Sequence, residues 1–173
     1  MSQRIVDLTL TIRDNMPVQD AFQRPVYVTL QTHESSRAFG AGTEEDPHTS
    51  SWKYLGIVEH TGTHVDAFFH MNPNGATIDR MPIDMFFGKA VCLDLTHVPD
   101  LGEITVSDLE AAERASGVSI DGHIVLLHTG FHNRHYPKQE LFDLNPGLTA
   151  EATHWLADHG SIVHGIEGPS TDT

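Results

Sequence analysis

The sequence contains a single cysteine, Cys92, so no disulfide can form within the chain. Because Val91 and Leu93 flank this residue, the pattern predicts a buried and inert thiol in a strand. Basic residues are also few: 10 lysines and arginines stand against 24 acidic residues, which gives a formal net charge of -14. An acidic surplus repels phosphate backbones and anionic bilayers, so we expect neither a nucleic-acid partner nor a membrane.

Long apolar runs are absent from the first thirty residues, where charged side chains interrupt every hydrophobic stretch. This composition excludes a signal peptide or a spanning helix in that region, and we therefore expect a cytoplasmic protein. Internal repeats and a second domain are also absent. A chain of 173 residues fits one domain, which at this size buries about two thirds of its unfolded surface. The prediction is a single domain over residues 1–173.

The first half of the chain reads as strands joined by a long connection. Stretches rich in Val, Ile, Leu, Thr and Tyr predict strands at 4–12 and 25–33. The composition of residues 34–51 predicts a long mobile loop, which is either a tolerated insertion or a lid. A further loop covers residues 71–84, and a short helical turn is predicted at 83–87.

From residue 89 onward, strands and helices alternate. Strands are predicted at 89–95, 122–128 and 161–166. One helix follows a capping box of Ser107 and Glu110 and stops at Gly117, and a second runs over 150–159 behind a Thr149 cap. This alternation predicts an α/β fold with parallel pairing, to which the first strands add a β-rich part.

Three imidazoles and one carboxylate crowd into the eleven residues from His60 to His70. His60, His64 and Asp66 are good donors for zinc, manganese or iron. In one helix, Asp66 would point roughly 200° around from His64, and in one strand His60 and His64 would lie about 13 Å apart. A bend at Gly62 brings all three toward one metal ion.

The remaining histidines give weaker signals. His128, His132 and His135 form a second cluster, but Gly130 and Asn133 interrupt a helix there, so we expect loop residues. Any contact of these three with substrate or metal stays open. We expect surface positions for the two histidines of the last helix, at 154 and 159, and a core or pocket position for the strand histidine at 164.

The pattern His-Thr-Gly-Thr-His-x-Asp-Ala-x-x-His at residues 60–70 resembles the signature of the cyclase superfamily, which includes bacterial kynurenine formamidases and isatin hydrolases. Further stretches are similar to that family along nearly the whole chain. They are Asp7-Leu8-Thr9-Leu10 with Met16-Pro17, Leu126-Leu127-His128-Thr129-Gly130, and the run from Pro146 to Asp172 that ends in a Ser-x-Asp motif. The resemblance implies a single α/β domain of the swivelling β/β/α type, with a mixed sheet and flanking helices.

Three departures from the family pattern stand out. Phe68 replaces a proline, which we expect to alter the loop, and Glu167 replaces an aspartate, which we expect to be tolerated. Family members generally continue for several tens of residues past the Ser-x-Asp motif and carry a further histidine and an acidic or amide residue there. We therefore expect that this chain lacks the C-terminal segment and cannot assemble a second metal site.

The resemblance implies a metal-dependent amidohydrolase that opens the C–N bond of an aryl amide such as N-formylkynurenine or isatin. A divalent ion, Zn2+ or Mn2+, held by His60, His64 and Asp66 would activate water and polarise the carbonyl. His70 lies beyond this ligand set, and we expect it to shuttle the proton. The predicted substrate contacts are Trp52 and Phe69 by stacking, and Ser170 and Asp172 by hydrogen bonding.

Two alternatives remain open at this point. The chain could be a lactone hydrolase or cyclase of the same superfamily, or a non-catalytic metal- or ligand-binding protein. The presence of His70 favours an enzyme, because a binding module needs no base beside its ligands. We also expect a homodimer or a higher homo-oligomer, in which a symmetric partner covers exposed apolar surface.

Overall fold

The computed structural model describes residues 4–45 and 47–172. Contacts within the chain divide it into two compact units, and the boundary falls between Val65 and Asp66. The single domain expected over residues 1–173 stays a prediction. None of the helices in the described part has the length and apolar content that a membrane-spanning segment needs.

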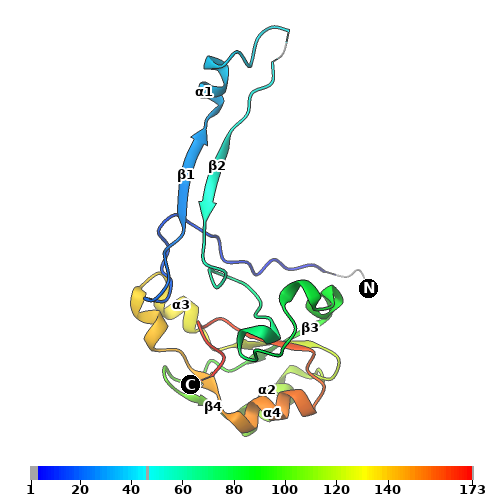
Figure 1. The fold of residues 1–173 in the computed structure, drawn as a ribbon. Helices are drawn as coiled ribbons and strands as arrows, with labels where there is room; N and C mark the ends of the chain where they lie inside the picture. Colours follow the sequence, from blue (N-terminus) through cyan, green and yellow to red (C-terminus); the bar gives the residue numbers. More distant parts are fainter. Residues whose placement is uncertain (1–3, 46, 173) are drawn as a thin grey trace. The chain divides into compact units, whose positions relative to one another are not determined.

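The first unit is built on a two-stranded antiparallel hairpin. Strand β1 (Val26–Gln31) pairs with β2 (Trp52–Gly56) (Figure 1). In this pairing Val28 lies opposite Tyr54. This pairing confirms the strand predicted at 25–33. The strand predicted at 4–12 is wrong: its described residues have no regular structure. The apolar composition there favours a strand, but a strand also needs a second strand to pair with, and the described residues of this stretch pair with none.

The connection between these strands is not loop throughout, as its composition predicted. Helix α1 (His33–Ala38) follows β1 directly. Thr32 and Ser35 form a reciprocal capping box, so that two backbone N–H groups at the start of the helix gain side-chain partners. The polar residues that suggested a loop are in part the ones that start this helix. A lid role for this connection stays a prediction.

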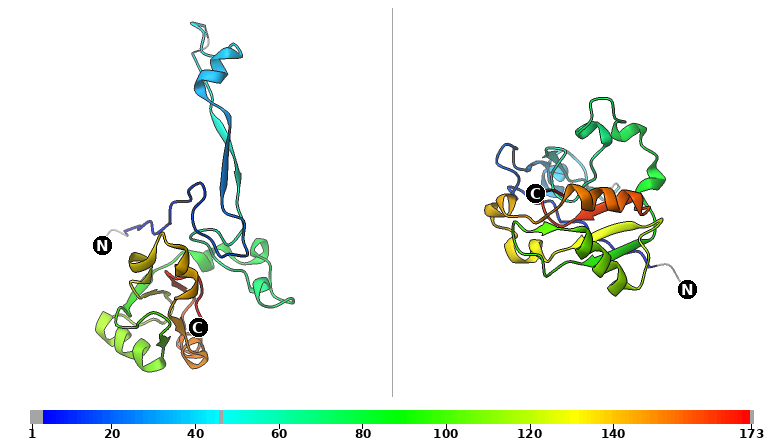
Figure 2. Two further views of the ribbon diagram at one scale, coloured as in Figure 1. Left: turned by 90° about the vertical axis from the view of Figure 1, so that its left-hand side faces the viewer. Right: turned by 90° about the horizontal axis from the view of Figure 1, so that it is seen from below.

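The second unit contains a three-stranded parallel sheet in the order β3-β5-β7 (Figure 2). Its strands are β3 (Ala90–Asp94), β5 (Ile124–His128) and β7 (Val163–Ile166). Helix α2 (Val106–Ser116) connects the first pair, and α4 (Ala150–Asp158) leads to the last strand. The predicted α/β class and parallel pairing are confirmed. Parallel and antiparallel pairings both occur, but in separate sheets.

One face of this sheet packs against α2 and α4 to form the core. Leu93 and Val125 from the sheet and Leu109 from α2 are fully buried, and Leu156 from α4 is 1% exposed. Side chains alternate between the faces of a strand, so Cys92 points away from this core and is exposed. The predicted buried thiol is therefore wrong, because flanking apolar residues define the opposite face.

The helix ends follow the expected chemistry with one correction. Helix α2 is capped by Thr105 with Asp108, and not by the predicted pair of Ser107 and Glu110. The prediction of a capping box was correct, but its position was wrong by two residues. Both pairs have the same spacing, so the sequence pattern alone does not distinguish them. Gly117 ends this helix at φ 69°, a conformation that glycine adopts without strain. Thr149 caps α4 as predicted and accepts a hydrogen bond from the Ala152 N–H group.

Several short elements complete the second unit. Strands β4 (Glu103–Ile104) and β6 (Gly147–Leu148) form a small parallel pair. The 3-10 turns are η1 (Phe68–His70), η2 (Ile78–Arg80), η3 (Ile83–Phe86) and η4 (Gln139–Asp143), of which η3 confirms a predicted helical turn. Helix α3 (Phe131–His135) corrects the loop predicted for this histidine cluster: Gly130, at φ 71°, starts the helix and does not break it.

Candidate metal centre

The backbone bends sharply in the histidine-rich stretch that follows β2. Gly62 has φ 69°, and the Thr61 N–H group donates to the Val58 carbonyl at 3.0 Å. A side chain at position 62 would be strained in this left-handed conformation. The bend predicted at Gly62 is confirmed. It turns the chain so that the residues before and after it face each other.

The bend brings three potential ligands together. Donor atoms of His60, His64 and Asp66 all lie within 4.8 Å of one another. His60 Nδ1 and His64 Nε2 are 3.0 Å apart. Donors of one zinc or manganese ion at about 2.1 Å stand roughly 3.0 to 4.2 Å from each other. The three donors stand close to this range, so the residues present fit a divalent metal ion.

The ring orientations also fit metal binding. His64 Nδ1 lies 2.8 Å from the Gly62 carbonyl oxygen and donates to it, which leaves the lone pair of Nε2 directed toward His60. On the other side, the Phe22 ring stacks on His60 with centroids 5.9 Å apart and an interplanar angle of 16°. No local pattern predicts this role for Phe22, which lies 38 positions before His60 in the chain. Both imidazoles are thus held by contacts outside the ligand set.

The threonines on either side of Gly62 stabilise the bend. Thr63 accepts a hydrogen bond from the Leu10 N–H group at 2.9 Å, and Thr61 is 4% exposed. Thr61 thus faces inward and Thr63 holds the N-terminal stretch, while His60 and His64, which flank them, are half-buried and exposed, respectively. This division explains how an accessible ligand set keeps a defined backbone.

The predicted proton shuttle and one predicted stacking residue follow on η1. His70 is exposed at the end of this turn, and its N–H group donates to the Ala67 carbonyl at 2.9 Å. Phe69 is 52% exposed, and its backbone is fixed by a 3.1 Å hydrogen bond to the Ala76 carbonyl. The turn begins at Phe68, where the family pattern has proline. Both residues therefore present accessible rings on an ordered backbone.

The other predicted substrate contacts lie on different elements. Trp52 begins β2 in the first unit and is 50% exposed. Ser170 and Asp172 lie in the second unit, where the Ser170 hydroxyl donates to the Asp172 carboxylate. The structure thus brings together two groups of predicted site residues. One is Ser170 with Asp172, and the other is His60 with His64 and Asp66. A common substrate site for these residues remains a prediction.

The histidines of the second cluster have separate environments. His135 Nε2 lies 2.7 Å from Asp100 Oδ2, so this ring is engaged in a hydrogen bond to the carboxylate. His132 stacks on Tyr136 with centroids 4.6 Å apart, and His128 is exposed at the end of β5. The predicted surface positions of the two α4 histidines are confirmed. Burial lowers the pKa of His164, as expected for a strand histidine that faces the interior.

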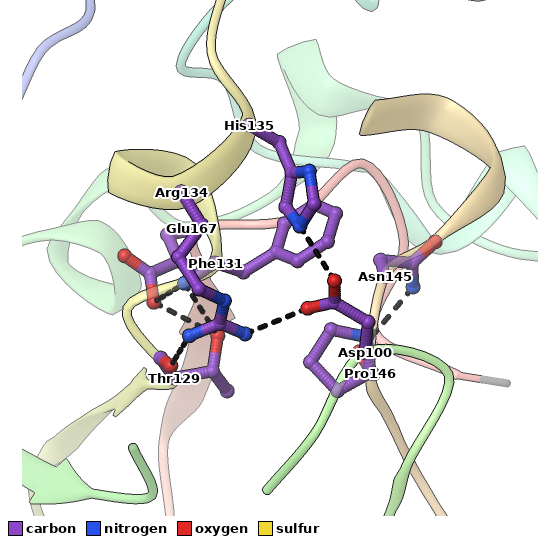
Figure 3. Close-up of polar contacts among 8 residues, drawn as sticks. All are labelled: Asp100, Thr129, Phe131, Arg134, His135, Asn145, Pro146 and Glu167. Atoms are coloured by element: carbon purple, nitrogen blue, oxygen red, sulfur yellow. Dashed lines mark hydrogen bonds and ion pairs between the residues drawn. The ribbon is translucent and has the colours of Figure 1, made fainter. Parts of the chain in front are cut away.

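A polar network around α3 has no local sequence signal. Asp100 pairs with Arg134 at 2.8 Å as well as with His135 (Figure 3). The hydrogen bond from Arg134 is the main reason that the pKa of Asp100 lies below its ordinary value, and His135 adds to it. Glu167 Oε1 accepts from the Phe131 N–H group at 3.0 Å and from the Thr129 hydroxyl at 2.8 Å. The glutamate is thus well accommodated, as expected.

The chain is similar to characterised proteins in both sequence and structure. Kynurenine formamidase from Bacillus thuringiensis subsp. konkukian (strain 97-27) is 30% identical over 115 residues, which are 65% of this chain and 49% of that protein. The chain spans about half the length of such relatives. Isatin hydrolase A from Ralstonia solanacearum superposes with a TM-score of 0.75 at 26% identity, covering 98% of this chain and 68% of that one.

Another solved structure is of a protein whose description names a metal. It is described as a potential metal-dependent hydrolase with cyclase activity, and it superposes with a TM-score of 0.67 at 24% identity, over 97% of this chain and 69% of that one. At this identity the likeness shows the fold alone. The family model described as Cyclase matches residues 6–173, almost the entire sequence. The chain therefore belongs to the cyclase family.

Proposed function

We propose that the chain is a metal-dependent hydrolase that cleaves the C–N bond of an aryl amide resembling N-formylkynurenine or isatin. The observation that carries this proposal is the convergence of His60, His64 and Asp66 at the bend around Gly62. The relatives named kynurenine formamidase and isatin hydrolase A support the substrate class. Because the chain spans only part of their length, the complete activity is part of the proposal.

The protein residues have distinct roles in this proposal. His60, His64 and Asp66 would hold the ion, and the Gly62 carbonyl fixes the His64 tautomer. A divalent ion bound there supplies Lewis acidity for the carbonyl and for water. Two imidazoles and one carboxylate suit both Zn2+ and Mn2+, and both ions remain in the proposal.

Proton transfer is assigned to His70. An imidazole can accept the proton of the attacking water and return it to the leaving nitrogen, which otherwise departs as a poor leaving group. His70 is exposed at the end of η1, outside the ligand set, and can therefore meet solvent and substrate. Trp52 and Phe69 offer rings for stacking on an aryl group, and Ser170 and Asp172 offer hydrogen-bonding groups.

Two rival functions have distinct outcomes in the same experiment. A lactone hydrolase or cyclase uses the same metal chemistry on an ester carbonyl, and a non-catalytic binder uses the ligands alone. The purified chain is assayed for bound metal and for turnover of N-formylkynurenine, isatin and simple lactones. Turnover of an aryl amide supports the proposal. Metal binding with turnover only of lactones, or with no turnover, supports a rival.

The role of His70 has its own test. His70→Ala should keep the metal content of the wild-type chain and lower kcat by about 10² to 10⁴, the usual contribution of a positioned acid-base group. His64→Ala should lose both metal and turnover. If His70→Ala strips the metal as thoroughly as His64→Ala, then His70 is a ligand and the assigned role is wrong.

We further propose that the chain forms a homodimer or a higher homo-oligomer. Val28 and Tyr54, directly opposite each other on the hairpin, are 45% and 57% exposed. Exposed apolar side chains that lie side by side favour association with a partner surface. Light scattering at micromolar concentration should give at least twice the chain mass of 19.1 kDa, and a monomer would contradict the proposal. The expected cytoplasmic location stays a prediction.

A further inference from the structure

The segment that follows β7 carries Ser170 and Asp172, two of the residues assigned to substrate binding. Its side chains are linked, because the Ser170 hydroxyl donates to the Asp172 carboxylate. Its described residues, 167–172, have no regular secondary structure apart from a parallel bridge between Asp172 and Leu148. Contacts from other parts of the second unit must therefore define its conformation.

Glu167 forms the first of these contacts at the start of the segment. Its carboxylate accepts from the Phe131 N–H group and the Thr129 hydroxyl, and both of these residues are fully buried. Water cannot easily replace the carboxylate at buried donors, so the contact is costly to break. Glu167 thus fixes the end of β7 to the start of α3.

The loop before α3, to which Glu167 binds, has further contacts. Arg134 donates to the Thr129 carbonyl at 2.9 Å and to Asp100 at 2.8 Å, and Asp100 also pairs with His135 (Figure 3). The Asp100 carboxylate therefore holds two side chains of α3, those of Arg134 and His135. Arg134 in turn holds the loop before the helix through the Thr129 carbonyl. The Glu167 carboxylate lies against the same loop, which is thereby held from both sides.

Asn145 forms the second contact, at the far end of the segment. Its Nδ2 atom lies 3.3 Å from each of the Ser170 and Asp172 carbonyl oxygens, and also 3.3 Å from the Pro146 carbonyl oxygen. The Leu148 N–H group donates to the carbonyl of the intervening residue, Thr171, at 2.8 Å. Three consecutive carbonyls of the segment thus have donors in the stretch from Asn145 to Leu148.

We propose that Asn145 and Glu167 are positioning residues that hold the Ser170–Asp172 backbone in the conformation that presents both side chains to substrate. This inference rests on the proposed function, since it assumes that Ser170 and Asp172 bind substrate. Neither positioning residue touches substrate or metal; each acts through the backbone. A misplacement of a substrate-binding group by about 1 Å can cost 10²-fold in rate. The contacts of Glu167 and Asn145, one at each end of this short segment, are therefore sufficient to control how Ser170 and Asp172 meet substrate.

The test of the Asn145 arm uses Asn145→Asp, which keeps the size of the side chain and replaces its donor by an oxygen. A carboxylate repels the carbonyl oxygens of Ser170 and Asp172, so the segment should detach. We expect KM to rise at least tenfold at unchanged metal content, and hydrogen exchange of the Leu148 amide to accelerate at least tenfold. Asn133→Asp makes the same chemical change at an exposed position of α3 and should change neither.

The Glu167 arm is tested with two variants. Glu167→Gln keeps a carbonyl oxygen that can accept both hydrogen bonds, and it should retain wild-type KM and Leu148 exchange. Glu167→Leu removes the acceptor and should raise both KM and the exchange rate of the Leu148 amide. Circular dichroism and metal analysis separate this effect from general unfolding, in which the exchange of amides in β5 would accelerate as well.

The outcomes distinguish this inference from the proposed function. Unchanged Leu148 exchange in both Asn145→Asp and Glu167→Leu overturns the positioning contacts, whatever the activity. Faster exchange with unchanged KM shows that the segment is held but does not serve substrate binding, which overturns the positioning role. A wild-type chain that binds metal but turns over no amide refutes the proposed function, while the exchange measurement still reports on the two arms.

Discussion

Replacement of His64 by alanine is the most direct test of the metal centre. His64 contributes one of two nitrogen atoms that lie 3.0 Å apart, and its other nitrogen is held by the Gly62 carbonyl. The substitution removes a ligand from an exposed position and should leave the fold of the metal-free chain unchanged. The exposed His154 on α4 provides a control, because His154→Ala makes the same chemical change away from the bend.

The expected effect follows from linkage between binding and folding. A metal ion present at 100 times its Kd stabilises the native state by about 2.7 kcal/mol. For a chain of this length, 1 kcal/mol shifts Tm by about 2 to 4 °C, so the wild-type Tm should rise by about 5 to 11 °C. If His64→Ala weakens binding about 100-fold, about 0.4 kcal/mol remains at the same concentration, and the shift falls to about 1 to 2 °C.

The assay is thermal unfolding of metal-free protein with added Zn2+ or Mn2+, combined with calorimetric titration to measure Kd. His154→Ala should show the full shift, and His64→Ala should lose most of it. The metal centre is refuted if neither ion shifts the wild-type Tm at millimolar concentration. It is also refuted if the loss is equal in both variants, because the effect would then be non-specific binding to histidine.

Two further predictions concern the second unit. Asp100 has a lowered pKa in the folded chain, so its contribution to stability is present above its unfolded value near 4 and is lost as pH falls through the folded value. Asp100→Asn should therefore flatten the dependence of stability on pH below pH 4, and an unchanged dependence would contradict the assigned contacts of Asp100 with Arg134 and His135. Thr149→Ala should destabilise the chain by about 0.5 to 2 kcal/mol in urea unfolding, because the Ala152 N–H group loses its cap; Thr149→Ser should restore most of this, and equal losses in both variants would exclude a capping role.

The sequence by itself determined the features that depend on near neighbours. The alternation of strands and helices after residue 89, the Thr149 cap and the stop at Gly117 all follow from local patterns. The bend at Gly62 belongs to the same class, since glycine is the residue that adopts positive φ at little cost. These properties are set within a few residues along the chain, so a single sequence is sufficient to predict them.

Tertiary structure decided the features that depend on distant partners. The stretch at 4–12 has strand composition but no strand partner, and Cys92 lies on the exposed face because α2 and α4 cover only the other one. The contacts of Asp100 with Arg134 and of Glu167 with Phe131 join residues more than thirty positions apart. The local pattern specifies the backbone conformation and which side chains share a face of a strand or helix. Which surfaces are covered, and which polar groups meet, is decided only when the chain has folded.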